Sequence, residues 1–113
     1  MDQWSPDSKP GGDSSLYGAM ISRIKSTGIK IKGVIWYQGE SEAMSGKTKN
    51  YGNDLLHLIG NIRKDVGDPD LPVIIVQIGC FMIHNPFMDK TFEEVREIQR
   101  NIIKQQKNKH GLI

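Results

Sequence analysis

The stretch Gly33-Val34-Ile35-Trp36-Tyr37-Gln38-Gly39-Glu40-Ser41-Glu42 joins an apolar run to an abruptly polar end. The run from Ile31 to Tyr37 is rich in β-branched and aromatic residues, which predicts a buried strand. Polar side chains follow where this strand ends, and ligands bind at the carboxyl ends of the strands in open α/β sheets. Gly39 lets the backbone turn sharply and lets a ligand approach it closely. The stretch therefore predicts a strand that leads into a ligand-binding loop, extending to about Asn50.

Apolar residues at helical spacing predict a helix on each side of this strand and loop. The first helix begins at one of residues 13–15, all of which are good N-caps, and ends at Gly28. The second runs from near Tyr51 to Val66, with its apolar residues on one face, and Gly67 closes it.

The rest of the chain adds further strands and a third helix. Val73–Ile78 is a near-continuous apolar run, typical of a strand that is covered on both faces. Thr91–Glu94 has the form of a capping box and opens a helix that ends at Gly111. Leu112-Ile113 then begins a third strand. This α-β-α-β-α-β order over residues 13–113, with connections long enough for crossovers, predicts an α/β, flavodoxin-like fold with a parallel sheet.

Length and composition narrow the class of protein. A chain of 113 residues is long enough for one small domain, and its net charge of +2 is too small to indicate nucleic acid or an anionic membrane as partner. Cys80 is the one cysteine, so no internal disulfide forms, and no apolar stretch is long enough to span a bilayer. Residues 1–12 are predicted to be a loop lead. Two complete strands are too few for such a sheet, so we expect an interior portion of a larger domain.

The stretch around Gln38 also resembles a block of a known family. Trp36-Tyr37-Gln38-Gly39-Glu40-Ser41 after a Gly-Val-Ile strand is similar to the third block of the sialate O-acetylesterase group. These are carbohydrate esterases of the SGNH (GDSL-like) hydrolase superfamily. Further landmarks of the resemblance occur in order between Leu16 and Gln99: Leu16–Ile21, Ile31–Gly33, Tyr51, Leu58-Ile59, Arg63, Asp70–Val73, Val76-Gln77 and Val95–Gln99. The resemblance implies a three-layer fold, of which this chain is a part. It also implies serine-dependent deacetylation of sugars such as sialic acid or xylan units, with no metal or other cofactor.

By this resemblance, Gln38 is the leading candidate for a catalytic residue. An ester attacked by a serine passes through an oxyanion, which N–H donors about 3 Å away stabilise. An asparagine fills that role in the wider superfamily, so Gln38 takes it here, and Gly39 contributes shape or a backbone N–H. Glu40 is expected to orient other groups, because a Ser-His-Asp enzyme has its base elsewhere. The alternative for Gln38 is a loop residue whose side chain is hydrogen-bonded to the backbone. The alternative for Glu40 is a surface residue without a role in catalysis.

Aromatic and histidine side chains near the strand ends are candidates for contacting substrate. Of Trp36 and Tyr37, one is expected in the core and the other in the acyl or sugar pocket, and Tyr37 is the candidate for the pocket. His84, in the loop after the second strand, is the other candidate, although a lone loop histidine is more often simply solvated.

Two short matches to the superfamily's catalytic motifs lack the required context. Gly12-Asp13-Ser14 follows a Pro/Gly/Ser-rich segment rather than a buried strand, so Ser14 is interpreted as a helix cap. Asp54 and His57 lie on the helix face opposite the apolar residues and should point to water. The nucleophile is expected upstream of this segment and the Asp-x-x-His block downstream of it. The 113-residue chain is therefore expected to have little or no activity by itself.

Two further expectations concern partners. The expected partner is an acetylated carbohydrate, and the alternative to an esterase is a non-catalytic α/β module that keeps the sugar crevice and binds a glycan weakly. A partial sheet exposes apolar strand edges, which predicts self-association.

Overall fold

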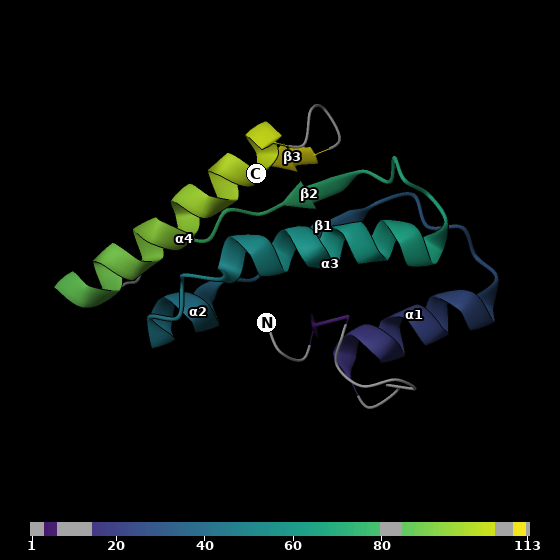
Figure 1. Cartoon of the computed structure of the whole chain (residues 1–113), viewed down its shortest axis with the longest axis horizontal. Coiled ribbons are helices and arrows are strands. Elements are labelled where there is room, and N and C mark those ends of the chain that lie inside the picture. The colour runs from purple at the N-terminus through teal and green to yellow at the C-terminus, as the bar shows by residue number, and fades with distance from the viewer. Residues whose placement is uncertain (1–3, 7–14, 80–84, 106–109, 113) are drawn as a thin grey trace.

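The computed structural model of the chain describes residues 4–6, 15–79, 85–105 and 110–112 (Figure 1). Each pair of successive strands is separated by helix, which confirms the predicted α/β class. In chain order the elements are α1 (Leu16–Thr27), β1 (Val34–Trp36), α2 (Glu40–Ser45), α3 (Tyr51–Val66), β2 (Val73–Ile75), α4 (Pro86–Gln105) and β3 (His110–Leu112).

The three strands form one parallel sheet in the order β1-β2-β3. Val34 of β1 lies opposite Val73 of β2, which in turn lies opposite His110 of β3. Neighbouring strands are therefore also consecutive in the chain, and helices make the connections between them, as a parallel arrangement requires. The carboxyl ends of all three strands meet at one edge, which we call the carboxyl edge.

The two faces of the sheet differ in burial because successive side chains of a strand point to opposite faces. Trp36, Val73 and Ile75 are buried on the face that carries the helices. Ile35 points the other way and is 71% exposed, and its neighbour in β2, Ile74, is only partly buried. Within the described residues the helices therefore cover one face of the sheet, whereas the apolar run of β2 had predicted cover on both.

Helix α3 forms the centre of the core. Its apolar face, predicted from the spacing, is buried at Leu55, Leu58, Ile59 and Ile62. Helix α1 packs against α3, beside which it lies in Figure 1. The same helix pair is joined by a hydrogen bond from the hydroxyl group of Tyr17 to the carboxylate of Asp65.

The predicted ends of the first two helices are confirmed by their caps. The Ser15 side chain accepts a hydrogen bond from the Gly18 N–H at 2.9 Å and so caps α1, and Gly28 ends that helix with a φ of 67°. Gly67 ends α3 with a φ of 73°. The N-cap serine and the terminal glycines lie next to the helices whose ends they determine, so the local sequence is enough to predict them.

Other predicted boundaries are wrong. The strands are shorter than the apolar runs, and helix α4 begins at Pro86 rather than at Thr91. The Thr91 hydroxyl does not cap the helix, because it donates to the buried carbonyl of Ala43 at 2.6 Å. Helix α4 ends at Gln105, and Gly111 lies in β3 instead of terminating the helix.

The segment predicted as one long loop after β1 contains the short helix α2. Gly39 precedes this helix and Gly46 ends it with a φ of 74°. Helix α2 packs on α4, and its buried residue Ala43 lies in that contact. Trp4, within the segment predicted to be a loop lead, meets the Trp36 ring edge-on with 5.7 Å between centroids. In the described segments, no helix has the combination of length and apolar character that a bilayer crossing demands.

Candidate functional site

The candidate site lies at the carboxyl edge, where the chain leaves β1 and β2. The segment Tyr37–Gly39 follows β1, and the segment Val76–Gly79 follows β2. Both segments lie next to helix α4, which supplies most of the side chains that hold them.

The Gln38 side chain is half-buried and is oriented by an acidic neighbour. Its Nε2 donates to Glu42 Oε2 at 2.5 Å. Its Oε1 is buried and has no hydrogen-bond partner among the residues that the structure describes. Burial acts to raise the pKa of Glu42, but hydrogen bonds to its carboxylate, including the one from Gln38, bring the pKa below its usual value. The carboxylate is therefore ionised at neutral pH and holds the amide nitrogen of Gln38 toward itself.

The main chain at Gln38 belongs to a buried set of hydrogen bonds among Trp36, Gln38, Tyr51, Ile78 and Gln99, which we call the strand-end network. The Gln38 carbonyl accepts from the Tyr51 hydroxyl at 2.8 Å and from Gln99 Nε2 at 3.0 Å. The Tyr51 oxygen accepts from Trp36 Nε1 at 3.4 Å and from Gln99 Nε2 at 3.2 Å. The Ile78 N–H donates to Gln99 Oε1 at 3.0 Å. Burial raises the pKa of Tyr51, so its phenol stays neutral and can donate.

Gly39 packs directly on this network. Its φ of 144° is rare for residues with a side chain, and a Cβ there would lie 2.9 Å from Val95 Cγ1. The same Cβ would lie 3.2 Å from the Tyr51 hydroxyl and 3.3 Å from Gln99 Nε2. The atoms that approach this glycine belong to α3 and α4, and the close approach of a ligand to Gly39 stays a prediction.

Helix α4 also holds the chain that follows β2. Arg96 Nη1 donates to the Ile78 carbonyl at 2.6 Å, and Gln77 Nε2 donates to the Arg96 carbonyl at 3.3 Å. Together with the bond from the Ile78 N–H to Gln99, these contacts fix both polar groups of the Ile78 backbone.

The carboxylate that contacts Gln38 is not Glu40, which the sequence predicted as an orienting group, but Glu42. Glu40 is the first residue of α2 and is half-buried. Glu42, two residues later, accepts the hydrogen bond from Gln38. Glu42 lies in the same stretch of sequence, but no pattern there indicated its role.

Of the two aromatic residues at the end of β1, one was expected in the core, and the other was a candidate for contacting substrate. Trp36 is buried and Tyr37 is 65% exposed, so the first is in the core and the second is available at the surface of the carboxyl edge. His84, the other candidate for contacting substrate, lies outside the described residues.

Of the two rejected motifs, the structure describes only the one that contains Asp54 and His57. Asp54 and His57 are both exposed on α3, as predicted, although Asp54, expected to lie away from any cleft, lines a polar cavity. Ser14 lies outside the described residues. In the described part of the chain, no three His, Cys, Asp or Glu side chains gather in a way that could hold a metal ion.

A polar cavity of about 520 Å³ lies beside the site, on the outer side of α2. Glu42 is shared between this cavity and the contact with Gln38. The cavity is otherwise lined by Ser41, Ser45, Lys47, Lys49, Asn50 and Asp54.

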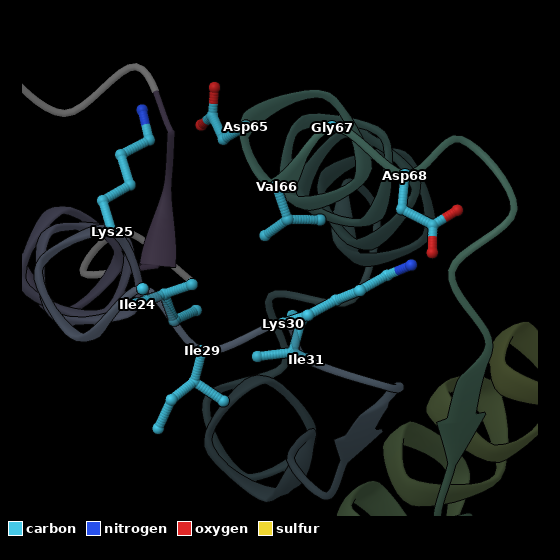
Figure 2. Close-up of a pocket in the computed structure, with 10 residues that line it drawn as sticks. Ile24, Lys25, Ile29, Lys30, Ile31, Asp65, Val66, Gly67 and Asp68 are labelled. Carbon is cyan, nitrogen blue, oxygen red and sulfur yellow. The ribbon is translucent and has the colours of Figure 1, made fainter.

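A second cavity, of about 470 Å³, lies at the opposite edge of the sheet (Figure 2). Its walls come from the end of α1, the segment that precedes β1 and the end of α3, with Ile24 and Val66 facing each other across it. Lys25, Lys30, Asp65 and Asp68 supply charges around it. Residues 24–31 of its lining lead into β1, and residues 65–68 lie before β2, so the cavity is at the amino ends of these strands and is separate from the carboxyl edge.

Comparison with known proteins identifies the family of this chain. The sequence profile of a family described as "Carbohydrate esterase, sialic acid-specific acetylesterase" matches residues 1–110. The chain belongs to this carbohydrate esterase family. A protein of Arabidopsis thaliana described as a probable carbohydrate esterase is 42% identical over 70 residues, which make up 58% of this chain and 27% of that protein. The match thus spans about a quarter of the relative's length. No solved structure matches the chain.

Family membership confirms the resemblance drawn from the sequence, and the structure adds residues that the reasoning missed. Tyr51 and Gln99 were landmarks of the resemblance, but no role was assigned to either. The sequence signal for Gln99 was its place at the end of the Val95–Gln99 landmark, and the structure adds that it is 0% exposed. A glutamine at a helix position next to Ile98 does not by itself reveal that it is buried.

Proposed function

We propose that this chain is the oxyanion-binding part of a serine carbohydrate esterase, with Gln38 as the hydrogen-bond donor. The observation that carries the proposal is the position of the Gln38 carboxamide, which follows β1 at the carboxyl edge and is held at both its main chain and its side chain. Preorganised donors are effective in catalysis because they do not have to reorient as charge develops on the reacting oxygen.

The hydrogen-bonding capacity of Gln38 suits this role. A carboxamide nitrogen has two hydrogens, so the bond to Glu42 leaves one hydrogen to donate to an oxyanion. The ionised carboxylate of Glu42 keeps the nitrogen, rather than the oxygen, on its own side of the amide. The buried Gln38 Oε1 lacks a donor among the described residues, and a role in catalysis is one explanation for such an acceptor.

Neighbouring residues take supporting roles in this proposal. Gly39 supplies the close approach of the backbone and a backbone N–H, and Tyr37 offers an exposed ring to the acyl group or the sugar. Glu40 orients other groups, a role in which it now accompanies Glu42. His84 is proposed as a substrate contact from its place after β2 in the sequence.

The proposed reaction is removal of an acetyl group from an acetylated carbohydrate, such as a sialic acid or a xylan unit. A serine hydroxyl attacks the acetyl carbonyl, the sugar hydroxyl leaves, and water hydrolyses the acyl-enzyme to acetate. No metal or other cofactor takes part. The serine, aspartate and histidine lie in other parts of an SGNH-type three-layer domain, of which this chain is the middle portion. Family membership supports this reaction.

The test compares the 113-residue chain with the natural polypeptide that carries this sequence. Acetate release from O-acetylated sialic acid and from acetylated xylan is followed for both. We expect turnover by the natural polypeptide, labelling of its serine by a fluorophosphonate, and little or no turnover by the 113-residue chain. Turnover by the 113-residue chain that Ser14→Ala abolishes would show that the rejected Gly-Asp-Ser motif is the real nucleophile.

The alternative is a glycan-binding α/β module without catalytic activity. The observation that favours it is the polar cavity beside α2, which is of a size and polarity to hold a sugar and needs no nucleophile. Under this alternative, the natural polypeptide binds acetylated sugars in calorimetry and releases no acetate.

We also propose that the 113-residue chain self-associates through β1. Among the residues that the structure describes, this strand pairs with β2 alone, and Ile35 is 71% exposed on the open face. An unpaired strand edge with exposed apolar side chains favours pairing with another chain.

A further inference from the structure

Gln99 is a polar residue that has been taken fully out of water. It lies in the last third of α4, and 0% of it is exposed. Burial of an amide without partners is costly, so its hydrogen bonds determine whether it stabilises the fold.

Every hydrogen-bonding direction of the Gln99 amide nitrogen is used, and the partners come from other segments. Nε2 has two hydrogens and donates to the Gln38 carbonyl and to the Tyr51 hydroxyl, at 3.0 and 3.2 Å. Oε1 accepts from the Ile78 N–H at 3.0 Å. The amide thus connects the chain after β1, the chain after β2 and the start of α3.

The donors and acceptors in this network fit one assignment only. The Tyr51 hydroxyl donates its single hydrogen to the Gln38 carbonyl, so its oxygen is left to accept from Gln99. If the Gln99 amide were turned over, its nitrogen would face the Ile78 N–H and its oxygen would face a carbonyl. The orientation of the Gln99 amide is therefore determined by its neighbours.

We propose that Gln99 is a positioning residue, whose buried amide holds the segments after β1 and β2 in register and thereby holds Gln38 where it can donate to an oxyanion. The catalytic part of this inference rests on the proposed function. Its structural part, that one amide serves the two segments through different atoms, stands on the hydrogen bonds alone.

The position of Gly39 makes this coupling direct. A Cβ on Gly39 would lie only 3.3 Å from Gln99 Nε2, so the backbone next to Gln38 rests on the Gln99 amide. Loss of the amide removes both a hydrogen bond and a packing contact from the segment that carries the proposed donor.

Two substitutions separate the atoms of the amide. Gln99→Met has a similar volume and removes all three hydrogen bonds. Gln99→Glu keeps an oxygen that can accept from the Ile78 N–H and, when ionised, loses the N–H that donates to Gln38. Asn101→Ala, on an exposed position of the same helix, is the matched control.

Nuclear magnetic resonance on the 113-residue chain reads the two segments separately. Hydrogen exchange of the Ile78 amide reports on the segment after β2, and the side-chain NH₂ resonances of Gln38 report on the segment after β1. In Gln99→Met we expect exchange at Ile78 to be at least about tenfold faster, the factor for losing one hydrogen bond of typical strength. The Gln38 resonances should move toward those of a solvated glutamine.

Burial raises the pKa of a carboxyl at this position, so in Gln99→Glu we expect the two reporters to respond differently at a pH high enough to ionise it. Exchange at Ile78 stays within about threefold of the parent protein, because the acceptor is retained. The Gln38 resonances move as they do in Gln99→Met. In the natural polypeptide, both variants lower kcat for deacetylation and leave KM little changed, and Asn101→Ala changes neither.

Unchanged reporters in a cooperatively folded Gln99→Met would overturn the inference, because Gln99 would then only fill space. If Gln99→Met does not fold, Gln99→Glu decides alone: equal changes in both reporters, or none at Gln38, refute the division of roles. Absence of turnover by the unmodified natural polypeptide would refute the proposed function. The Ile78 and Gln38 reporters would still test whether Gln99 holds the two segments.

Discussion

Replacement of Gly39 by alanine tests the packing of the candidate site most severely. Gly39 has a φ of 144°, and a Cβ there would lie 2.9 Å from Val95 Cγ1, which is closer than real Cβ contacts. Val95 is itself 0% exposed in the middle of α4 and has little room to move. Gly39→Ala therefore forces either the backbone after β1 or the helix behind it to shift.

Two effects set the size of this destabilisation. A residue with a side chain in so rare a conformation costs about 1–3 kcal/mol. Overpacking of a buried site by a methyl group costs about 1–3 kcal/mol more. Their sum is about 2–6 kcal/mol, against a total of roughly 6–17 kcal/mol for a domain of this length. The variant should lose a large share of its free energy of unfolding.

Gly60→Ala is the matched control, because it makes the same chemical change inside α3 where a Cβ meets nothing within 4 Å. Alanine is favoured over glycine within a helix by about 0.8–1.0 kcal/mol, so this variant should be slightly more stable than the parent protein. The same substitution thus has opposite signs at the two positions.

Urea unfolding followed by circular dichroism measures both variants beside the parent protein. We expect a clearly lower midpoint for Gly39→Ala, or no cooperative transition, and an equal or higher midpoint for Gly60→Ala. A Gly39→Ala midpoint that matches the parent protein would show that the backbone at Gly39 relaxes freely. The described packing of the strand-end network would then be wrong.

Three further perturbations test other parts of the structure. Thr91→Val keeps the side-chain shape but leaves the buried Ala43 carbonyl without its donor. The free energy of unfolding in urea should fall by about 1–3 kcal/mol. No fall would mean that this hydrogen bond does not stabilise the fold. Burial raises the pKa of both Tyr17 and Tyr51, so above about pH 10 their phenol groups ionise in the unfolded chain first. The free energy of unfolding should therefore fall as pH rises from there. A flat profile between pH 9 and about 12 would contradict this. Ile35→Lys places a charge on the open face beside the unpaired edge and should raise the monomer fraction in sedimentation velocity, and an unchanged fraction would exclude β1 as the contact.

The parts of the fold that the sequence predicts well are those determined by neighbours in the chain. Helix α3 has its apolar residues on one face and a glycine at its end, and both its bounds are as predicted. Helix α4 was predicted to begin at Thr91, because a threonine three residues before a glutamate has the form of a capping box. Its hydroxyl instead meets the carbonyl of Ala43, which is 48 residues away, and no local pattern announces that partner.

Helix α2 was missed for a related reason. It has six residues, too few for a periodic apolar pattern, and it lies in a stretch dominated by polar side chains. What stabilises it is burial of Ala43 against α4 and the hydrogen bond from Thr91. These contacts exist only once the distant helix is in place.

The candidate site was predictable in its position but not in its support. Gln38 was located by the strand that precedes it and by the family resemblance. Gln99 was not assigned a role, because its burial depends on where α4 crosses the ends of β1 and β2. Glu42 was given no role, because its contact with Gln38 depends on the turn of α2, which was not predicted.

The most direct measurement of the central claim is kcat for release of acetate from an O-acetylated sugar by the natural polypeptide, with and without Gln38→Ala. If Gln38 donates to the oxyanion, kcat should fall by about 10²–10³, with KM little changed, because the lost interaction is made in the transition state. Asn101→Ala should leave both constants unchanged. A Gln38→Ala protein that is folded and keeps its kcat within about threefold of the parent protein would contradict the claim, since losing one oxyanion donor costs far more.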